Sequence, residues 1–361
     1  MLELTILIPC LNEEDTIGKC INKAKTSMKK NKIKGEILII DNGSTDNSIK
    51  ISRRLGARVI LETKHKGYGI ALRKGIINAK GKYIIMGDAD DSYDFSIINK
   101  FYKKLVNGYD FVQGCRFPSG GGRIKKNAMP FSHQYFGNPF FSYLLKFLFK
   151  IPFNDVYCGM RGFKKSIALK HNYICKGMQF AIENLLKFHL TSKKVTEIPI
   201  ILHKDGRKQH SGHLKTVSDG IKTLKLILLL SPTWFYFIFQ AFLFLLFFND
   251  LSNSFQNELG FNNLISKHLL FISISLQLFF LWVYSRLTSI NLGFSKEGNF
   301  LKLFFKFFKI EYLILFLVIL LFVIFFLNQY SINLNFIILV SIISFNSLIV
   351  SLTELLKNKQ Y

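Results

Sequence analysis

The fold is decided by the segment Lys82-Tyr83-Ile84-Ile85-Met86-Gly87-Asp88-Ala89-Asp90-Asp91, in which an apolar strand runs into an acidic turn. Comparable apolar runs occur earlier, at residues 4–9, 36–41 and 58–61. Between and after them, the patterns at 17–29, 47–55 and 69–79 predict helices. Apolar strands that alternate with helices predict a parallel sheet that is covered on both faces, so we expect an α/β domain.

The acidic turn is the strongest chemical signal in the chain. Asp88 and Asp90 point to the same side of an extended segment, because successive side chains alternate along a strand. Two carboxylates in this position repel each other unless a hard cation such as Mg²⁺ lies near them. Ligands of parallel sheets bind beyond the carboxyl ends of the strands, where the turns after the first, second and fourth strands fall. The pattern predicts a divalent-metal site, and a solvated acidic turn is the alternative.

Two other phosphate-binding motifs are excluded or weak. Gly67-Tyr68-Gly69 has the start of a dinucleotide fingerprint, but the sixth position is Leu72. The fingerprint requires glycine or alanine there, so a nicotinamide dehydrogenase is disfavoured. The chain contains no G-x-x-x-x-G-K-[ST] segment, which disfavours a P-loop NTPase.

Four motifs in order resemble an inverting family 2 glycosyltransferase of GT-A (Rossmann-like) fold, and more narrowly its dolichol-phosphate or polyprenyl-phosphate mannosyl- and glucosyltransferase branch. They are residues 9–14 (Pro-Cys-Leu-Asn-Glu-Glu), 41–46 (Asp-Asn-Gly-Ser-Thr-Asp), 66–75 and 88–90. The segments 114–117, 155–163, 177–183 and 195–200 continue the resemblance, which covers residues 3 to 230 closely. Processive synthases of this superfamily carry Q-x-x-R-W, which this sequence lacks, so a single transfer is favoured.

The resemblance implies roles for individual residues. Those expected at the nucleotide-sugar donor are Pro9, Asn12, Glu14, Asp41, Gly43, Lys66, Arg73, Asp88, Ala89, Glu183 and Arg207. Among them, Asp41 would accept a hydrogen bond from the base, and Glu183 would contact sugar hydroxyls or lie on a helix surface. The metal, Mg²⁺ or Mn²⁺, would be held on the diphosphate by Asp88, Asp90 and Ser92.

A second set of residues is expected at the acceptor. A lipid phosphate has a second pKa near ~6, so it is mostly ionised and needs little help from a base. The site must instead supply positive charge, for which the candidates are Arg116, Arg123, Lys126, Arg161 and Arg207. We expect Asp155, Arg116 and Arg161 to be the catalytic residues, with Asp155 acting as a base or only orienting Arg161. The loop at 203–214 resembles the family's gating segment, and its three histidines are a weaker metal-site candidate.

Composition separates this part of the chain from a C-terminal membrane part. The protein has 361 residues and a net charge of +25. The first 230 residues hold 40 Lys and Arg and 18 Asp and Glu, whereas the last 131 hold only 8 and 5. Apolar stretches at 232–248, 268–284, 312–327 and 332–352 predict about four transmembrane helices, with buried core helices as the alternative. We therefore expect a catalytic domain at 1–213, a juxtamembrane amphipathic helix at 214–231 and a transmembrane domain at 232–361.

Loop charges predict the topology. Residues 249–266 carry two acids and no Lys or Arg, whereas 286–310 carry five basic residues and one Glu. The positive-inside rule then predicts a multi-pass protein of the cytoplasmic membrane with its catalytic domain in the cytoplasm. Residues 140–153, with Lys146 and Lys150 on one face, and 300–310 fit helices that lie at lipid headgroups, and a core helix is the alternative for the first.

Other classes of partner receive less support. No nucleic-acid-binding motif accompanies the positive charge, so we expect no nucleic acid as a partner. Five cysteines with no C-x-x-C pair disfavour a zinc cluster or a disulfide framework. The sequence leaves a homo-oligomer open.

The expected function is the transfer of one hexose from GDP-mannose or UDP-glucose to a polyprenyl (dolichyl or undecaprenyl) phosphate, with inversion. Two alternatives stay open. One is transfer to another lipid acceptor such as diacylglycerol or ceramide, which requires a true base. The other is a catalytically silent membrane protein with a relic glycosyltransferase domain.

Overall fold

The computed structural model describes residues 2–192, 194–208 and 216–256, and seven single positions between 275 and 290. The chain divides into two compact units, Met1–Ile227 and Leu228–Tyr361. Several predictions fall outside the described residues: the histidines at 210 and 213, the interfacial segment 300–310, and, apart from isolated positions, the second to fourth apolar stretches.

The first unit is built on a seven-stranded sheet with the order β3-β2-β1-β4-β7-β5-β8. Its strands are β1 (Leu4–Cys10), β2 (Gly35–Asp41), β3 (Arg58–Leu61), β4 (Tyr83–Met86), β5 (Phe111–Cys115), β7 (Arg161–Lys164) and β8 (Val195–Pro199). Only β7 runs antiparallel to its neighbours, β4 and β5. The prediction of a mostly parallel α/β sheet is confirmed, and the inserted strand β7 is an addition to it.

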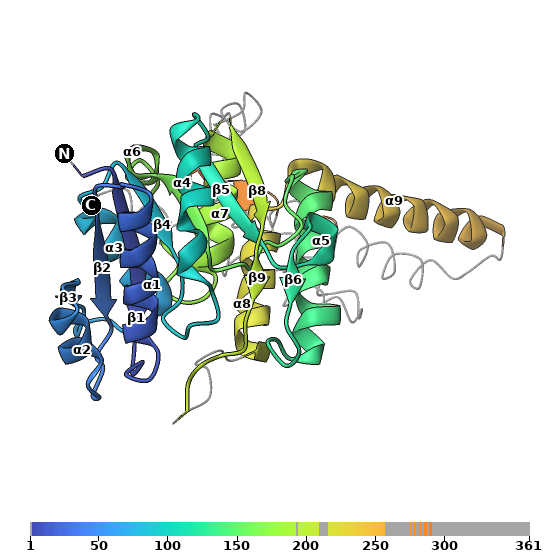
Figure 1. Ribbon diagram of the computed structural model, residues 1–361. Coiled ribbons are helices and arrows are strands. Elements are labelled where there is room, and N and C mark those ends of the chain that lie inside the picture. Colours follow the sequence, from blue (N-terminus) through green and yellow to red (C-terminus); the bar gives the residue numbers. More distant parts are fainter. Residues whose placement is uncertain are drawn as a thin grey trace. The chain divides into compact units, whose positions relative to one another are not determined.

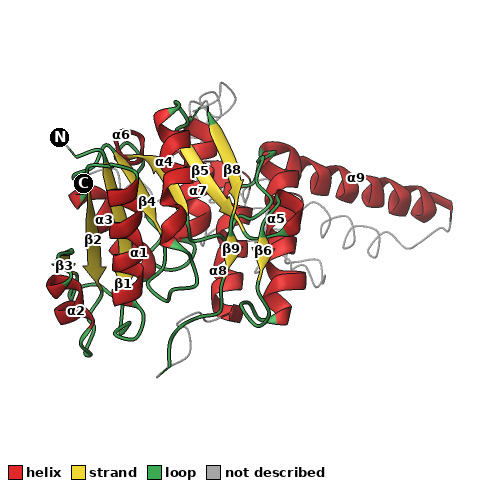
Figure 2. Cartoon of the chain, in the orientation of Figure 1, coloured by secondary structure: helices red, strands yellow, loops and turns green. Residues whose placement is uncertain are grey.

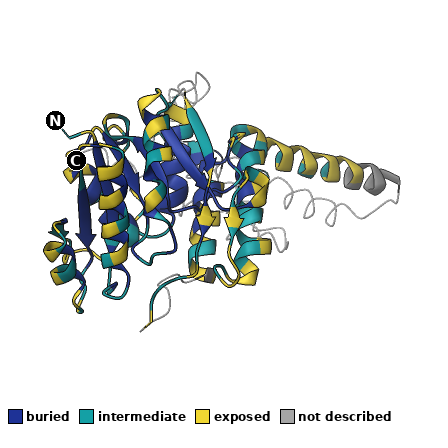
Figure 3. Ribbon diagram, in the orientation of Figure 1, coloured by how far each residue is buried: buried dark blue, intermediate teal, exposed yellow. Residues whose placement is uncertain are grey.

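Helices cover both faces of this sheet. Figure 1 shows α1 (Ile17–Lys30) and α4 (Ile98–Val106) over one face, and α3 (Tyr68–Asn78) and α7 (Phe180–Thr191) on the other. Because both faces are covered, consecutive residues of β1 from Leu4 to Ile8 are all buried, and Figure 3 shows the central strands in the colour of buried residues, whereas the edge strand β8 is partly exposed. The remaining elements of this unit are α2 (Ser48–Arg54), α5 (Asn138–Phe149), α6 (Lys165–Ala168) and the short pair β6 (Arg123–Ile124) and β9 (Ile201–Leu202).

The strand register brings three turns together at one edge. Cys10 at the end of β1 pairs with Asp41 at the end of β2, and Leu7 pairs with Met86 at the end of β4. The turns after these strands therefore leave the sheet side by side, and Figure 2 draws those after β1 and β2 as loops at the same edge. Short polar side chains from three separate sequence segments can meet there.

Helix α8 (Thr216–Leu230) lies within the segment 214–231 that was expected to form the juxtamembrane helix, and the second unit begins in its last turn. Helix α9 (Thr233–Gln256) contains the first predicted span and exposes large side chains such as Phe242 and Leu245. Within the described residues, no single helix has the length and apolar composition to cross a membrane. One bent pair, Val217–Leu230 with Thr233–Asn249 at 87°, passes that test jointly. The expected four-helix membrane domain stays a prediction.

Candidate active site

Side chains of the first two turns are tied to each other. The Asn12 backbone N–H donates to Ser44 Oγ (2.9 Å), and Asn12 Oδ1 accepts from the Thr45 backbone N–H (2.8 Å). Glu14 Oε2 likewise accepts from the Asn47 backbone N–H (2.9 Å). Asn12 adopts a left-handed backbone conformation (φ 57°), which asparagine tolerates better than most residues. The structure thus gives Asn12 and Glu14 the task of fixing the loops beside half-buried Pro9, and their contact with a nucleotide stays a prediction.

Asp41 ends strand β2 with one carboxylate oxygen used and the other unused. Oδ2 accepts from the backbone N–H groups of Gly43 (3.0 Å) and Ser44 (3.1 Å). Oδ1 is buried and has no hydrogen-bond partner among the described residues, and the residue is 1% exposed. A buried acceptor without a partner carries a desolvation cost, which a ligand N–H would remove. This geometry fits the predicted contact with a nucleotide base.

The segment that carries Lys66 is anchored beside Asp41. Asn42 donates through Nδ2 to the carbonyls of Glu62 and His65 (both 3.0 Å), and its Oδ1 accepts from the Gly67 backbone (2.7 Å). The exposed Lys66 side chain therefore starts next to this turn, and its stem passes Gly43. Sequence reasoning did not single out Asn42, whose role depends on a loop 20 to 25 residues away.

The acidic pair lies on the turn after β4. Asp88 Oδ1 accepts from the Tyr68 hydroxyl (2.9 Å), and Asp90 Oδ1 accepts from Ser92 Oγ (2.6 Å) and its backbone N–H (3.0 Å). Ala89 between them is buried, and its carbonyl accepts from Cys20 Sγ. Burial and the neighbouring Asp90 raise the pKa of Asp88 to about 6. The contact of Tyr68 with Asp88 was not predicted, because an aromatic residue at the start of a helix carries no distinctive sequence signal.

This pair fits a metal that takes its other ligands from a substrate. Among the described residues, no group of three or more His, Cys, Asp or Glu side chains is arranged to hold an ion. Mg²⁺, however, commonly takes only one or two protein carboxylates and completes its shell with water and substrate phosphates. Burial and, after it, the neighbouring Asp90 disfavour the charged form of Asp88, and a bound cation would favour that form. Ser92 fits better as a support for Asp90 than as a ligand.

Arg207 is the cation that the protein itself brings to these acids. Its guanidinium donates to both carboxylate oxygens of Glu13 (2.5–3.0 Å) and to Asp205 (2.6 Å), and lies 3.6 Å from Asp90 Oδ2. The backbone of Gly206 donates to the Asp90 carbonyl (2.9 Å), which holds this segment on the turn. Arg207 thus lies beside the acidic turn, and its contact with the donor or with the acceptor phosphate stays a prediction. Its main partner, Glu13, was missed in favour of Glu14.

Asp155 forms a buried pair with Arg116. Asp155 is fully buried, and its two oxygens accept from Arg116 Nε (2.6 Å), Nη2 (2.8 Å) and the Arg116 backbone (3.0 Å). The orienting role was predicted toward Arg161, and the structure corrects the partner to Arg116. With both oxygens engaged, Asp155 is better placed to align a guanidinium than to accept a proton.

The Arg161 side chain lies in the protein interior and not at a ligand-binding surface. Arg161 starts strand β7, is fully buried, and donates to the carbonyls of Ala181 (2.7 Å) and Cys158 (2.6 Å). The guanidinium therefore joins α7 to the segment before β7, and burial lowers its pKa. The prediction that Arg161 binds the acceptor phosphate is corrected, because a side chain without exposed surface cannot reach one.

Glu183 on α7 also serves the scaffold. It is fully buried, accepts from the backbone N–H groups of Ile174 and Cys175 (both 2.8 Å), and pairs with Lys187 (3.0 Å). The neighbouring loop packs closely on the start of α3, where a Cβ at Gly69 would lie 2.2 Å from the Cys175 carbonyl. Glu183 therefore shapes a loop, which corrects both expectations for it: it contacts no open site and does not lie on a helix surface. Arg73, half-buried on α3, lies near this loop.

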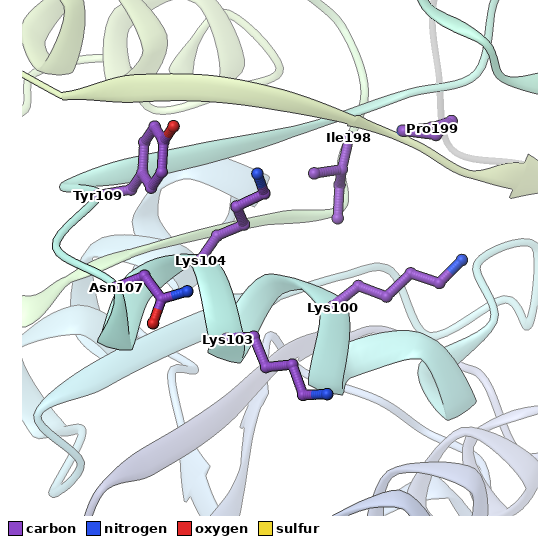
Figure 4. Close-up of a pocket in the computed structure, with 7 residues that line it drawn as sticks. All are labelled: Lys100, Lys103, Lys104, Asn107, Tyr109, Ile198 and Pro199. Carbon is purple, nitrogen blue, oxygen red and sulfur yellow. The ribbon is translucent and has the colours of Figure 1, made fainter.

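A separate cavity of about 350 Å³ lies between α4 and β8 (Figure 4). Its lining residues are Lys100, Lys103, Lys104, Asn107, Tyr109, Ile198 and Pro199. The Lys104 ammonium lies 5.3 Å from the centre of the Tyr109 ring. None of the predicted site residues lines this cavity, so it offers no alternative active site.

Comparison with known proteins gives the same family as the motifs. Residues 5–171 match the model of glycosyl transferase family 2. A low-salt glycan biosynthesis hexosyltransferase of Haloferax volcanii is 30% identical over 234 residues, which are 64% of this chain and 55% of that protein. A dolichyl-phosphate hexose transferase of the same organism is 27% identical over 198 residues, 55% of this chain and 82% of that protein. The chain thus spans only about half the length of the first relative.

Solved structures extend the comparison to the fold. Glucosyl-3-phosphoglycerate synthase from Mycobacterium tuberculosis, in complex with Mn²⁺, uridine diphosphate and glucosyl-3-phosphoglycerate, superposes with a TM-score of 0.50. It is 16% identical, and the match covers 63% of this chain and 79% of that one. At this identity the likeness shows a shared fold only. The sequence matches therefore identify a glycosyl transferase family 2 domain over residues 5–171, and the solved structure adds the likeness in fold only.

Proposed function

We propose that the protein transfers one hexose from a nucleotide sugar to a polyprenyl phosphate at the cytoplasmic face of a membrane, with inversion and with Mg²⁺ or Mn²⁺. The single observation that carries this proposal is that an unsatisfied buried acceptor and a pair of carboxylates lie at the same edge of the sheet. Asp41 Oδ1 lies at the end of β2, and Asp88 and Asp90 follow β4 at the same edge.

Asp41 suits the base of a nucleotide sugar, and the turn with Asp88 and Asp90 suits its diphosphate. The base offers N–H donors, for which Asp41 Oδ1 is an available acceptor. The diphosphate brings negative charge, which the carboxylates of Asp88 and Asp90 tolerate only through a shared cation. When bound, the metal would neutralise charge on the leaving diphosphate. The Mn²⁺ and uridine diphosphate named for the structural neighbour support the same assignment.

The acceptor chemistry needs positive charge more than a base. An oxygen of the lipid phosphate would attack the anomeric carbon as the bond to the diphosphate breaks and the nucleoside diphosphate leaves with the electron pair. An ionised phosphate loses no proton in this step. Arg116, held by three hydrogen bonds to Asp155, is aligned for such an acceptor, and exposed Arg123 and Lys126 extend the positive surface. A dolichyl-phosphate hexose transferase among the relatives supports this acceptor.

An exposed aromatic face supports a lipid bilayer as partner. Phe136, Phe140, Tyr143 and Phe147 follow a helical spacing on and before α5 and are 53–71% exposed, whereas Leu145 and Leu148 of the same helix are buried. Aromatic side chains on one face of a helix suit the interface between lipid headgroups and acyl chains. Lys146, expected on the lipid side, instead donates to Asn154 Oδ1 (2.5 Å).

A transfer assay tests the proposal. Membranes that contain the full chain receive radiolabelled UDP-glucose or GDP-mannose, Mg²⁺ and undecaprenyl or dolichyl phosphate. We expect organic-extractable label that is lost with EDTA and with Asp90→Ala. The matched control is Asp94→Asn, because Asp94 only caps a short helix through Ser96. No label with either donor, while nucleotide binding persists, would contradict the acceptor and favour another lipid. If the protein forms no labelled product and also binds no nucleotide, the alternative of a catalytically silent relic domain is favoured.

A further inference from the structure

Glu197 on β8 holds the turn at Asn154 and Asp155, which lies more than 40 residues earlier in the sequence. Its Oε1 accepts from the backbone N–H groups of Asn154 (2.9 Å) and Asp155 (3.0 Å), and its Oε2 accepts from Asn154 Nδ2 (2.8 Å). One carboxylate thus satisfies three donors of two consecutive residues. Hydrogen bonds to a charged acceptor are shorter and roughly twice as strong as neutral ones, so this turn is firmly held.

A second side chain holds the same turn from the neighbouring strand. Gln113 of β5, which lies opposite Glu197 in the parallel register, donates through Nε2 to the Asp155 carbonyl (2.9 Å). The backbone of Asp155 is therefore fixed on both sides, at its N–H by Glu197 and at its carbonyl by Gln113. The Asp155 carboxylate then aligns Arg116 by two side-chain hydrogen bonds.

The surroundings of Glu197 leave it little room to move. A Cβ built at Gly120 would lie 2.9 Å from Glu197 Oε2 and 2.4 Å from Cys115 Sγ. Asn154, which Glu197 holds, also accepts from Lys146 of α5. Glu197 therefore lies between the exposed aromatic helix and the Asp155–Arg116 pair, and each contact in this series is a direct hydrogen bond.

We propose that Glu197 is a positioning residue for the transfer reaction, which acts by holding the Asn154–Asp155 turn and through it the Arg116 guanidinium. This inference rests on the proposed function. Catalytic groups need to be held within a fraction of an ångström, and the residues behind them provide that precision. Among the described residues, no hydrogen bond joins Glu197 to the donor edge, that is, to the turns after β1, β2 and β4, so we expect its effect on the acceptor side.

Two variants of the full chain separate positioning from simple loss of packing. Glu197→Ala removes all three acceptors, whereas Glu197→Gln keeps one oxygen for the two backbone N–H groups. Hydrogen exchange over residues 152–158 reports the turn directly. Initial rates at varied donor and acceptor report the reaction. Glu3→Ala is the control, because Glu3 is an exposed carboxylate near the start of β1.

We expect Glu197→Ala to accelerate amide exchange at Asn154 and Asp155 and to lower kcat by about 10- to 100-fold, as is typical when a supporting residue is removed. The KM for the nucleotide sugar should stay within about twofold, because the donor contacts are elsewhere. Glu197→Gln should keep slow exchange and most of kcat. Glu3→Ala should match the wild type in both measurements.

Three results would overturn the inference: unchanged exchange in Glu197→Ala, faster exchange with unchanged kcat, or a loss in Glu197→Gln as large as in Glu197→Ala. Failure of the proposed function gives a different signature. If the wild type forms no glycolipid, the function is wrong, and the exchange measurement still decides whether Glu197 holds the turn.

Discussion

The donor edge of the sheet and the acceptor side differ in how their charged groups are satisfied. At the donor edge, Asp41 keeps one oxygen without a partner, and the pKa of Asp88 is raised to about 6. On the acceptor side, Asp155 and Arg116 satisfy each other, and Glu197 accepts from two backbone N–H groups and the Asn154 side-chain amide. Both regions consist of motif residues, but both oxygens of each acceptor-side carboxylate are hydrogen-bonded, whereas Asp41 Oδ1 at the donor edge has no partner among the described residues.

This difference separates residues that serve a ligand from residues that serve the protein. A buried charge is tolerated when a partner compensates its desolvation, and within the protein that partner has to be built in. Where the protein leaves a buried polar atom without a partner, as at Asp41 Oδ1, a ligand can supply one. Loss of a donor-edge group should therefore cost activity, and loss of an acceptor-side group should cost stability first.

The largest expected effect is on activity at the donor edge. Asp90→Asn should lower the transfer rate by about 1000-fold, because it removes a carboxylate that would hold the metal on the leaving group. The free energy of unfolding should stay level or rise, since the like charge that raises the pKa of Asp88 is gone. Initial rates and thermal unfolding measure the two quantities. If Asp90→Asn had the same transfer rate as Asp94→Asn and a clearly lower free energy of unfolding than the wild type, the comparison would be reversed.

The second effect is on stability at the acceptor side. Arg116→Met leaves Asp155 buried without its guanidinium and should lower the free energy of unfolding by about 3–5 kcal/mol. The double variant Arg116→Met with Asp155→Leu should regain much of that loss, because it removes both charges together. Denaturant titration of the three proteins measures the coupling. Equal destabilisation by the single and double variants would show that the pair matters for its shape rather than its charge.

The third effect is on donor affinity. In Asp41→Asn, the amide oxygen can still accept from Gly43 and Ser44, so the loop should keep its form. The amide nitrogen then replaces the unused acceptor, and the Kd for UDP or GDP should rise about 10-fold, or about 1.4 kcal/mol. Calorimetric titration with Mn²⁺ present measures this change. Unchanged affinity with an unchanged melting temperature would remove Asp41 from the base pocket.

The smallest expected effect is a pH dependence of the free energy of unfolding, which arises from His171. Burial, with a contribution from nearby Lys187, lowers the pKa of His171 to about 4 from its ordinary value of 6.5. Between these values the unfolded chain binds a proton that the folded protein does not. Stability should therefore fall as the pH drops from 6.5 to 4, by about 1 kcal/mol after solvent screening is allowed for.

Replacement of His171 by Gln should flatten the pH dependence of the melting temperature over this range. An identical slope in His171→Gln and wild type would assign the pH dependence to other groups.

Prediction from the sequence succeeded where the signal was local. Strand β3 has the predicted bounds, α1 and β2 differ by one residue at one end, and α3 is shifted by one residue. Apolar periodicity and turn residues act over a few positions, so they can be read without the fold. Strand β7 was not predicted, because its four residues, Arg161–Lys164, carry no alternating pattern. Its place in the sheet depends on β4 and β5 instead.

Prediction of individual roles was weaker, and for one physical reason. Motifs identify which residues belong to the site region, but the direction of a side chain depends on neighbours that are distant in sequence. Arg116 is paired with a residue 39 positions away, and Arg207 with one 194 positions away. Arg161 and Glu183 lie within motifs as well, yet packing of α7 turns both into the core.

The sequence alone therefore determined the α/β architecture, the family and the acidic turn at Asp88 and Asp90, since each follows from short-range patterns and their order. Only the tertiary structure decided which charges are paired inside the protein and which are left for a ligand. That distinction is a matter of burial and of contacts across strands. It made Glu13 and Glu197 part of the site region, and it moved Arg161 and Glu183 into the scaffold.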